Sequence, residues 1–211
     1  MSYTYAQLKT AIQDYTENTE TSFVTNLPTF IKNAEQRIFK LVDLELFRKN
    51  ATSTLSQDDP FLSVPSDYLA SFSLSVTNSS SKEFLLQKDV NFIQEYNPNP
   101  ATTGIPKYYA FFDIDNFIVA PTPSSNLAVE LHYYYRPASL TAGADSGTTW
   151  LSENAPNAML YGSLVEAYTY MKGEQDMLTM YEKQFTEALS RIKDLAEARE
   201  NSDAYRRGLP D

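Results

Sequence analysis

The stretch ELHYYYRP at residues 130–137 holds the chain's only histidine, three tyrosines and an arginine. These residue types serve acid–base catalysis, and exposed tyrosines also form platforms that bind sugars. A hydrolytic triad would need a serine and a carboxylate beside the imidazole, and the chain has no G-x-S-x-G spacing. Alternation along a strand puts His132 and Tyr134 on one face and Tyr133 and Tyr135 on the other. The stretch therefore predicts a strand of a sheet, in which His132 is an ordinary strand residue and not a catalytic one.

Other residues with chemical potential are acidic. Asp113 and Asp115 in FDIDNF suggest a cation site, but the glycine and the distant glutamate of a calcium loop are missing, so a turn is the better interpretation. No spacing fixes a catalytic pair among 27 acidic residues, and the six glycines form no phosphate-binding loop. We predict no catalytic, cofactor-binding or metal-binding residues. A hydrolase is the least supported class.

Composition excludes further classes of function. Cysteine is absent, which excludes disulfides and thiolate sites, and a single histidine excludes histidine-rich metal sites. With 17 basic and 27 acidic residues the net charge is −10, which repels a phosphate backbone. The start MSYTYAQLKT is no signal peptide, and no apolar run could span a membrane. We expect a soluble protein made in a cytoplasm.

Helical periodicity marks the first part of the chain. Thr4 and Gln7 have capping-box spacing and predict the start of a first helix. After the linker TENTETS, the segment NLPTFIKNAEQRIFKLVDLELF predicts a second helix with Pro28 in its first turn. Its apolar stripe consists of Ile31, Ala34, Ile38 and Leu41.

From Asn50 the pattern is that of strands. In SFSLSV, apolar Phe72, Leu74 and Val76 alternate with serines and predict a half-buried strand. EFLLQ predicts its return strand, and KDVNFIQEY a short helix capped by Asp89. Further strands are expected in PKYYAFF, FIVAP and LAVELHYYYRP, before the loop ASLTAGADSGTTW. Together they predict a compact antiparallel sheet or a small sandwich.

Helices return after Trp150. Asn154 is a candidate cap, Pro156 fits a first turn, and Gly173 marks the end of the next helix. The last helix carries a regular seam that must pack along another helix or across a subunit boundary. The candidate subunit-packing residues are Leu178, Tyr181, Phe185 and Ile192 of this seam, with Tyr134 and Arg136 of the strand.

The closing segment RENSDAYRRGLPD combines an aromatic, two cations and an apolar residue in a polar context. Such a mixture is typical of interface hot spots, although a frayed, solvated end is an equal alternative. The candidate binding residues here are Tyr205, Arg206, Arg207 and Leu209.

These patterns predict an α+β fold in which N- and C-terminal helices form one bundle around an inserted antiparallel β domain, followed by a flexible tail. The expected parts are residues 1–48 (N-terminal helices), 49–149 (β domain with one short helix), 150–199 (C-terminal helices) and 200–211 (extension).

Several phrases occur in an order that resembles a known family. They are NAEQRIFKLVDLELFRKNAT, LSVPSDYLASFSL, GIPKYYAFFD, VELHYYYRP and MLYGSLVEAYTYMKGEQDMLTMYEKQFTEAL. The set is similar to head-to-tail adaptor proteins of tailed bacteriophages, also called connector or head-completion proteins, most like those of short-tailed phages. The resemblance runs from about Asn33 to Tyr205.

The resemblance implies a structural protein of the virion neck, with no enzymatic activity and no cofactor. It implies a ring of copies, usually a dodecamer, which docks beneath the portal protein, joins the capsid to a nozzle or tail-tube protein, and extends the channel through which DNA passes. It also implies a C-terminal extension that reaches the portal, here Tyr205 to Leu209. The alternative from the strand tyrosines is a β-rich carbohydrate- or protein-binding module.

Overall fold

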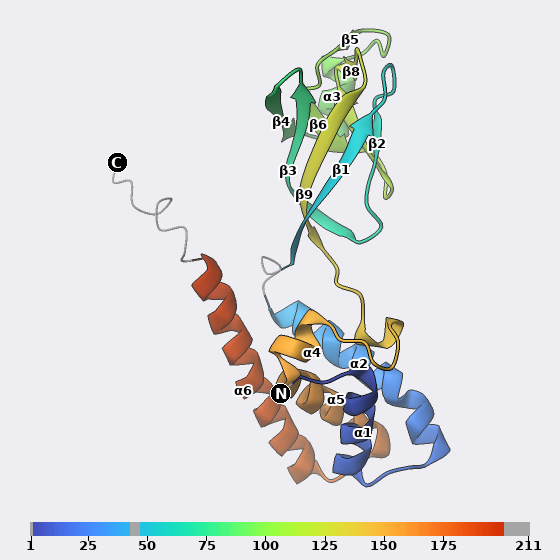
Figure 1. Cartoon of the computed structure of the whole chain (residues 1–211), viewed down its shortest axis with the longest axis vertical. Helices are drawn as coiled ribbons and strands as arrows, with labels where there is room; N and C mark the ends of the chain where they lie inside the picture. Colours follow the sequence, from blue (N-terminus) through green and yellow to red (C-terminus); the bar gives the residue numbers. More distant parts are fainter. Residues whose placement is uncertain (1, 43–46, 201–211) are drawn as a thin grey trace, which may run out of the picture. The chain divides into compact units, whose positions relative to one another are not determined.

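The computed structural model describes residues 2–42 and 47–200, with side chains described as far as Asp194 (Figure 1). The chain divides into two compact units. The helical unit comprises residues 1–46 and 138–211, and the β unit comprises residues 47–137. The segment 138–149, which sequence patterns group with the strands, belongs to the helical unit.

The helical unit begins with α1 (Tyr5–Thr16) and α2 (Thr21–Leu41). The predicted capping box is confirmed, because the Gln7 backbone N–H donates to Thr4 Oγ1 at 3.2 Å and the Thr4 N–H to Gln7 Oε1 at 2.9 Å. The predicted start of α2 is wrong, since Pro28 lies inside the helix. Phe23 and Leu27 are fully buried, so their packing extends the helix through the expected linker.

The second half of the helical unit contains α4 (Trp150–Asn154), α5 (Pro156–Met171) and α6 (Gln175–Glu200). Pro156 occupies the first turn of α5 as predicted. The predicted cap at Asn154 is wrong: Thr149 caps α4, and the Asn154 amide donates to the Trp150 carbonyl at 2.9 Å. α5 stops where Lys172 adopts a left-handed conformation, just before Gly173.

One core holds the helical unit together. α5 packs against α1, α2 and α6, and residues of all four helices share this core. Its largest fully buried side chains include Leu8, Ile12, Phe23, Leu27, Ile31, Ile38, Leu140 and Phe185. Leu140 starts the 3-10 helix η2 (Leu140–Ala142) and enters the same core. The carboxylate of buried Glu35 accepts the Leu140 N–H at 2.8 Å, which ties this loop to α2.

The β unit contains a seven-stranded sheet in the order β1-β9-β3-β4-β6-β7-β2, beside a two-stranded sheet of β5 and β8. The strands are β1 (Arg48–Leu55), β2 (Phe61–Ser63), β3 (Tyr68–Asn78), β4 (Ser81–Gln87), β5 (Thr103–Gly104), β6 (Tyr108–Phe111), β7 (Asn116–Ala120), β8 (Thr122–Pro123) and β9 (Leu127–Tyr135). The large sheet is antiparallel except where β4 pairs with β6. The predicted sheet is thus mostly antiparallel, and the α+β class is confirmed.

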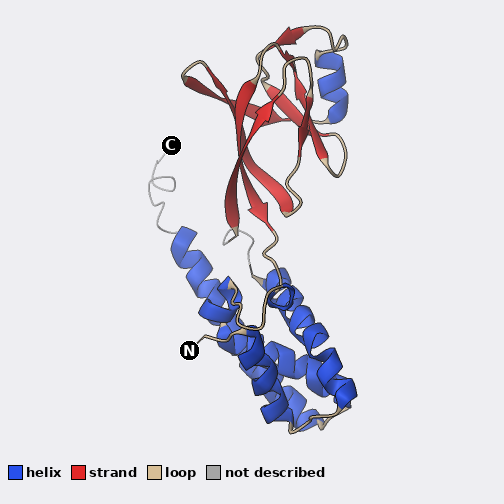
Figure 2. Cartoon of the chain, turned by 45° about the vertical axis from the view of Figure 1, so that its right-hand side comes forward, coloured by secondary structure: helices blue, strands red, loops and turns tan. Residues whose placement is uncertain are grey.

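The large sheet buries one face in a core of its own. This core unites strands distant in the sheet order, because Leu55 of β1, Leu62 of β2 and Phe117 of β7 belong to it. On the other face of β6 and β7 lies α3 (Val90–Tyr96), which buries Ile93 against Ala110 and Ala120 (Figure 2). Asp89 is the N-cap residue of α3 as predicted, but its side chain makes no capping hydrogen bond.

Strand β3 departs from strict alternation. Its pairing with β9 shifts register between Ser71 and Ser73, which is the mark of a β-bulge. Leu74 and Val76 are buried as predicted, whereas Phe72 is half exposed and contacts Tyr134. The prediction that Phe72 shares the buried face is therefore wrong. Phe72 is itself the unpaired, extra residue of the bulge, so its side chain points to the other face of the sheet.

No helix within the described part of the chain is both long enough and apolar enough to cross a membrane.

Candidate interaction surfaces

The outward face of β9 carries a charged surface network. The carboxylate of Glu130 contacts the ammonium group of Lys82, accepts the Asn50 amide at 2.7 Å and lies 3.3 Å from His132 Nε2. The hydrogen bond from Lys82, followed by that from Asn50, holds the pKa of Glu130 below its ordinary value. The side chain of His132 is 43% exposed and meets no nucleophile in this network. This geometry agrees with the expectation that His132 is a strand residue without a catalytic role.

Tyr134 and Arg136, two predicted subunit-packing residues, lie further along β9 and just beyond it. The Tyr134 ring meets Phe72 edge-on at 6.4 Å, and the Arg48 guanidinium lies 4.8 Å from the Phe72 ring centroid and 5.5 Å from that of Tyr134. Arg136 is exposed, and its backbone N–H donates to the Asp67 carbonyl at 2.8 Å. Both side chains point outward as predicted, and contact with another subunit stays a prediction.

The inward side of β9 forms a structural network. The Tyr133 hydroxyl donates to Asp67 Oδ1 at 2.8 Å, and Lys49 Nζ lies 2.7 Å from Asp67 Oδ2. Burial opposes ionisation of Asp67, but the hydrogen bonds from Lys49 and Tyr133 outweigh it and hold its pKa below the ordinary value. The network joins β1, the turn before β3 and β9, so it stabilises the β unit.

The turn between β6 and β7 presents an apolar residue to solvent. Asp113 Oδ1 accepts the backbone N–H of Asp115 at 2.8 Å and the Asn116 side-chain amide at 3.1 Å, which confirms the turn interpretation. These bonds, first that from Asp115, lower the pKa of Asp113. Ile114, held between the two aspartates, is 87% exposed. Within the described residues, no group of three or more acidic, His or Cys side chains is arranged to hold a metal.

Two exposed aromatic residues lie on or beside the strands next to this turn, Phe61 at the start of β2 and Phe112 just after β6. Phe61 and Phe112 lie 5.0 Å apart between ring centroids, and both are more than one-third exposed. We call Phe61, Phe112 and Ile114 the Ile114 cluster. The sequence analysis did not predict this cluster, because Asp113 and Asp115 indicate a polar turn. The available signal was an isoleucine at the centre of a turn, where polar residues and glycine are usual.

α3 carries a second exposed aromatic surface. The Phe92 and Tyr96 rings are nearly parallel, at 11° and 6.0 Å between centroids, and Tyr108 meets them edge-on at 5.1 and 4.9 Å. The Lys88 ammonium lies 5.3 Å from the Phe92 ring centroid. The carbohydrate- or protein-binding alternative would depend on exposed rings of this kind.

The α6 seam packs within the chain. Tyr181, Phe185 and Ile192 are buried in the core of the helical unit, and Leu178 is partly buried against it. Burial and the neighbouring Tyr168 raise the pKa of Tyr181 to about 12. The sequence allowed a second helix or a subunit boundary as the partner, and the structure shows α5 of the same chain.

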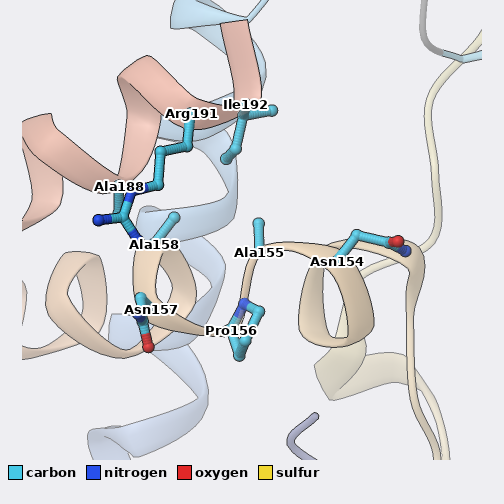
Figure 3. Close-up of a pocket in the computed structure, with 8 residues that line it drawn as sticks. All are labelled: Asn154, Ala155, Pro156, Asn157, Ala158, Ala188, Arg191 and Ile192. Atoms are coloured by element: carbon cyan, nitrogen blue, oxygen red, sulfur yellow. The ribbon is translucent and has the colours of Figure 1, made fainter. Parts of the chain in front are cut away.

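A pocket of about 130 Å³ lies where α5 begins beside α6 (Figure 3). We call it the α5–α6 pocket. The residues that line it are Asn154, Ala155, Pro156, Asn157, Ala158, Ala188, Arg191 and Ile192. In Figure 3 the side chain of Arg191 reaches along α6 toward the start of α5, while that of Asn154 points away. The pocket is too small for a typical cofactor, since such sites measure about 300–1,000 Å³.

The tail residues Tyr205, Arg206, Arg207 and Leu209 lie outside the described residues.

Comparison with known proteins gives one family. The family model described as SU10 adaptor protein matches residues 3–208, which is nearly the whole chain. No curated protein matches the sequence.

Proposed function

The chain belongs to the SU10 adaptor protein family and is a structural adaptor of a bacteriophage, and from this premise we propose that it forms a ring beneath the portal. Membership implies association with portal and tail components in the neck of the virion. In our proposal the ring is a dodecamer that joins the capsid to the nozzle or tail-tube protein and extends the DNA channel. A place among the adaptors of short-tailed phages is part of the proposal, on the strength of the ordered sequence motifs.

The observation that carries the proposal is the family match over residues 3–208. The division into units supports it, because a helical unit and a β unit with separate cores offer distinct surfaces to distinct partners. The charge of −10 also supports it, since an acidic channel wall repels DNA and lets it slide as passing cargo.

The C-terminal segment is the proposed portal-binding element. It follows α6 directly and contains Tyr205, Arg206, Arg207 and Leu209. Tyrosine and arginine are the residue types that contribute most to interface affinity when they enter a partner's pockets. Residues 201–211 would therefore anchor each copy to the portal.

Deletion of residues after Ala198 tests this element. We expect the truncated chain to bind purified portal rings at least about tenfold more weakly in co-sedimentation, because loss of a single hot-spot residue already costs about 2 kcal/mol. The variant Arg206→Ala with Arg207→Ala should account for much of the loss.

The matched control replaces Lys183 and Lys193 of α6 with alanine. Both lysines are exposed, so the control removes the same charge from the chain as the arginine double variant. We expect it to bind portal rings like the unmodified chain. Undiminished binding of the truncated chain would exclude tail docking, and a full-length chain that never associates with portal rings would exclude the adaptor role.

A further inference from the structure

The Ile114 cluster presents apolar side chains to solvent from an ordered turn and its neighbouring strands. Hydrogen bonds to Asp113 hold the turn, so Ile114 is presented by an ordered backbone at the end of the β6–β7 hairpin. Phe112, two residues from Ile114, pairs its ring with that of Phe61, the first residue of β2, which is hydrogen-bonded to β7 of the same hairpin. A contiguous apolar surface with a polar rim is typical of protein interaction sites, whereas isolated apolar side chains need no partner.

The rim of this cluster is acidic. Asp113 and Asp115 flank Ile114, and Asp59 Oδ1 accepts the backbone N–H of Phe61 at 3.0 Å. All three aspartates are exposed. A surface that receives the cluster therefore needs an apolar hollow and positive charge at its edge.

The α5–α6 pocket of the same chain has these properties. Ala155, Pro156, Ala158, Ala188 and Ile192 give it apolar lining, and Asn154, Asn157 and Arg191 supply the polar part, with Arg191 as its positive charge. An apolar cavity of roughly 150 Å³ can hold a benzene molecule. A pocket of about 130 Å³ is therefore large enough for the four-carbon side chain of isoleucine.

Charge at the pocket complements charge at the cluster. Arg191 lies 3.3 Å from Glu187 one turn earlier, and both side chains are more than half exposed, so this pair is weak and Arg191 can exchange it for another carboxylate. The start of α5 adds positive potential, since its N-cap Ala155 offers no side-chain acceptor to the first backbone N–H groups.

We infer that Ile114 of one copy inserts into the α5–α6 pocket of a second copy, with Asp115 facing Arg191. The cluster belongs to the β unit and the pocket to the helical unit, so the contact joins two different surfaces. Such a contact repeats from copy to copy and closes a ring where the rotation permits. The inference rests on the proposed ring and names the residues that hold its copies together.

Disulfide cross-linking tests the contact directly, because the chain contains no cysteine. Ile114→Cys and Ala188→Cys are made in separate full-length chains, mixed, assembled with portal rings and mildly oxidised. A bond forms only where the two Cα atoms come within about 7 Å. We expect a covalent dimer on non-reducing gels. Since each chain carries one cysteine, a product that links the two variants is intermolecular.

The matched control pairs Ile114→Cys with Met180→Cys. Met180 is exposed on the same helix, eight residues before Ala188, which places it about 12 Å from the pocket along the helix axis. We expect little cross-linked product from this pair. Absent cross-linking of the Ile114→Cys and Ala188→Cys pair, or equal yield from both pairs, would overturn the inference.

The same gels separate this inference from the proposed function. Rings that assemble on the portal without the cross-link leave the adaptor role intact and exclude this contact. A cross-linked product from chains that never associate with the portal supports the contact and excludes the adaptor role.

A charge exchange checks the predicted pair. Asp115→Lys and Arg191→Glu should each weaken self-association about two- to fivefold in sedimentation, as expected for an exposed ion pair. The two substitutions in one chain should restore it. Asp113 is left unchanged because it holds the turn. Failure of the double variant to recover would contradict the pairing of Asp115 with Arg191.

Discussion

At the residue scale, the buried carboxylate of Glu35 supports the loop that returns the chain to the helical unit. Its side chain is 3% exposed, accepts the Leu140 N–H at 2.8 Å and also receives a hydrogen bond from the Ser139 side chain. Glu35→Ala leaves the buried Leu140 N–H without this acceptor. We expect a loss of about 1–3 kcal/mol in the free energy of unfolding, measured by urea denaturation at neutral pH.

Glu35→Gln is the control and carries a pH signature. Burial raises the pKa of Glu35, and the hydrogen bonds only partly offset this. The folded chain therefore binds this proton more tightly than the unfolded chain. The stability that Glu35 contributes rises as pH falls through its folded pKa and is complete below its unfolded value. Glutamine keeps an acceptor without a charge, so we expect Glu35→Gln to unfold at no lower urea concentration at neutral pH and to lack this dependence. A midpoint like that of Glu35→Ala would contradict the account.

Gly162 of α5 lies where this helix packs against both α2 and α6. A Cβ at this position would lie 2.8 Å from Phe185 Cε2 of α6 and 3.1 Å from Ala34 Cβ of α2. Alanine favours a helix over glycine by about 1 kcal/mol, whereas overpacking a core costs about 1–3 kcal/mol. We expect the clash to dominate, so that Gly162→Ala lowers the urea midpoint.

The double variant with Phe185→Leu isolates the cause of that loss. Leucine removes the ring atoms that the new methyl group would strike, so Gly162→Ala should cost less in the Phe185→Leu background than alone. An equal cost in both backgrounds would mean that the ring is not the source of the strain.

At the element scale, the start of a helix was predictable from the sequence where residues next to that start determine it. Thr4 with Gln7 and Pro156 each marked a helix start that the structure confirms. The start of α2 at Thr21 was not predictable in this way, because buried Phe23 and Leu27 stabilise a helix across residues that look like a linker. Local signals are weak compared with tertiary packing.

In the β unit, too, local patterns were predictable from the sequence, whereas features that depend on distant residues were not. Alternation correctly separated the two faces of β9, but it could not reveal the bulge that turns Phe72 outward, since a bulge depends on pairing with a partner strand. The outward direction of Tyr134 and Arg136 was likewise predictable. The α5–α6 pocket was not, because it forms between Asn154 and Ile192, on helices that only the folded chain brings together.

At the scale of the whole molecule, the two units have separate cores. The core of the helical unit and those of the β unit share no residue among the described side chains. Leu164 of α5 and Leu74 of β3 are matched probes, since both are leucines with at most 1% exposure. Removal of a buried leucine side chain costs about 2–5 kcal/mol.

We therefore expect each substitution to loosen its own unit. In hydrogen exchange of the full chain, Leu74→Ala should accelerate exchange of backbone amides in residues 47–137 and leave those of α1, α2 and α5 close to their original rates. Leu164→Ala should show the converse pattern. Equal acceleration in both units by either variant would mean that the two units unfold as one cooperative body. Two separately stable units could then no longer explain how one adaptor chain binds both portal and tail components.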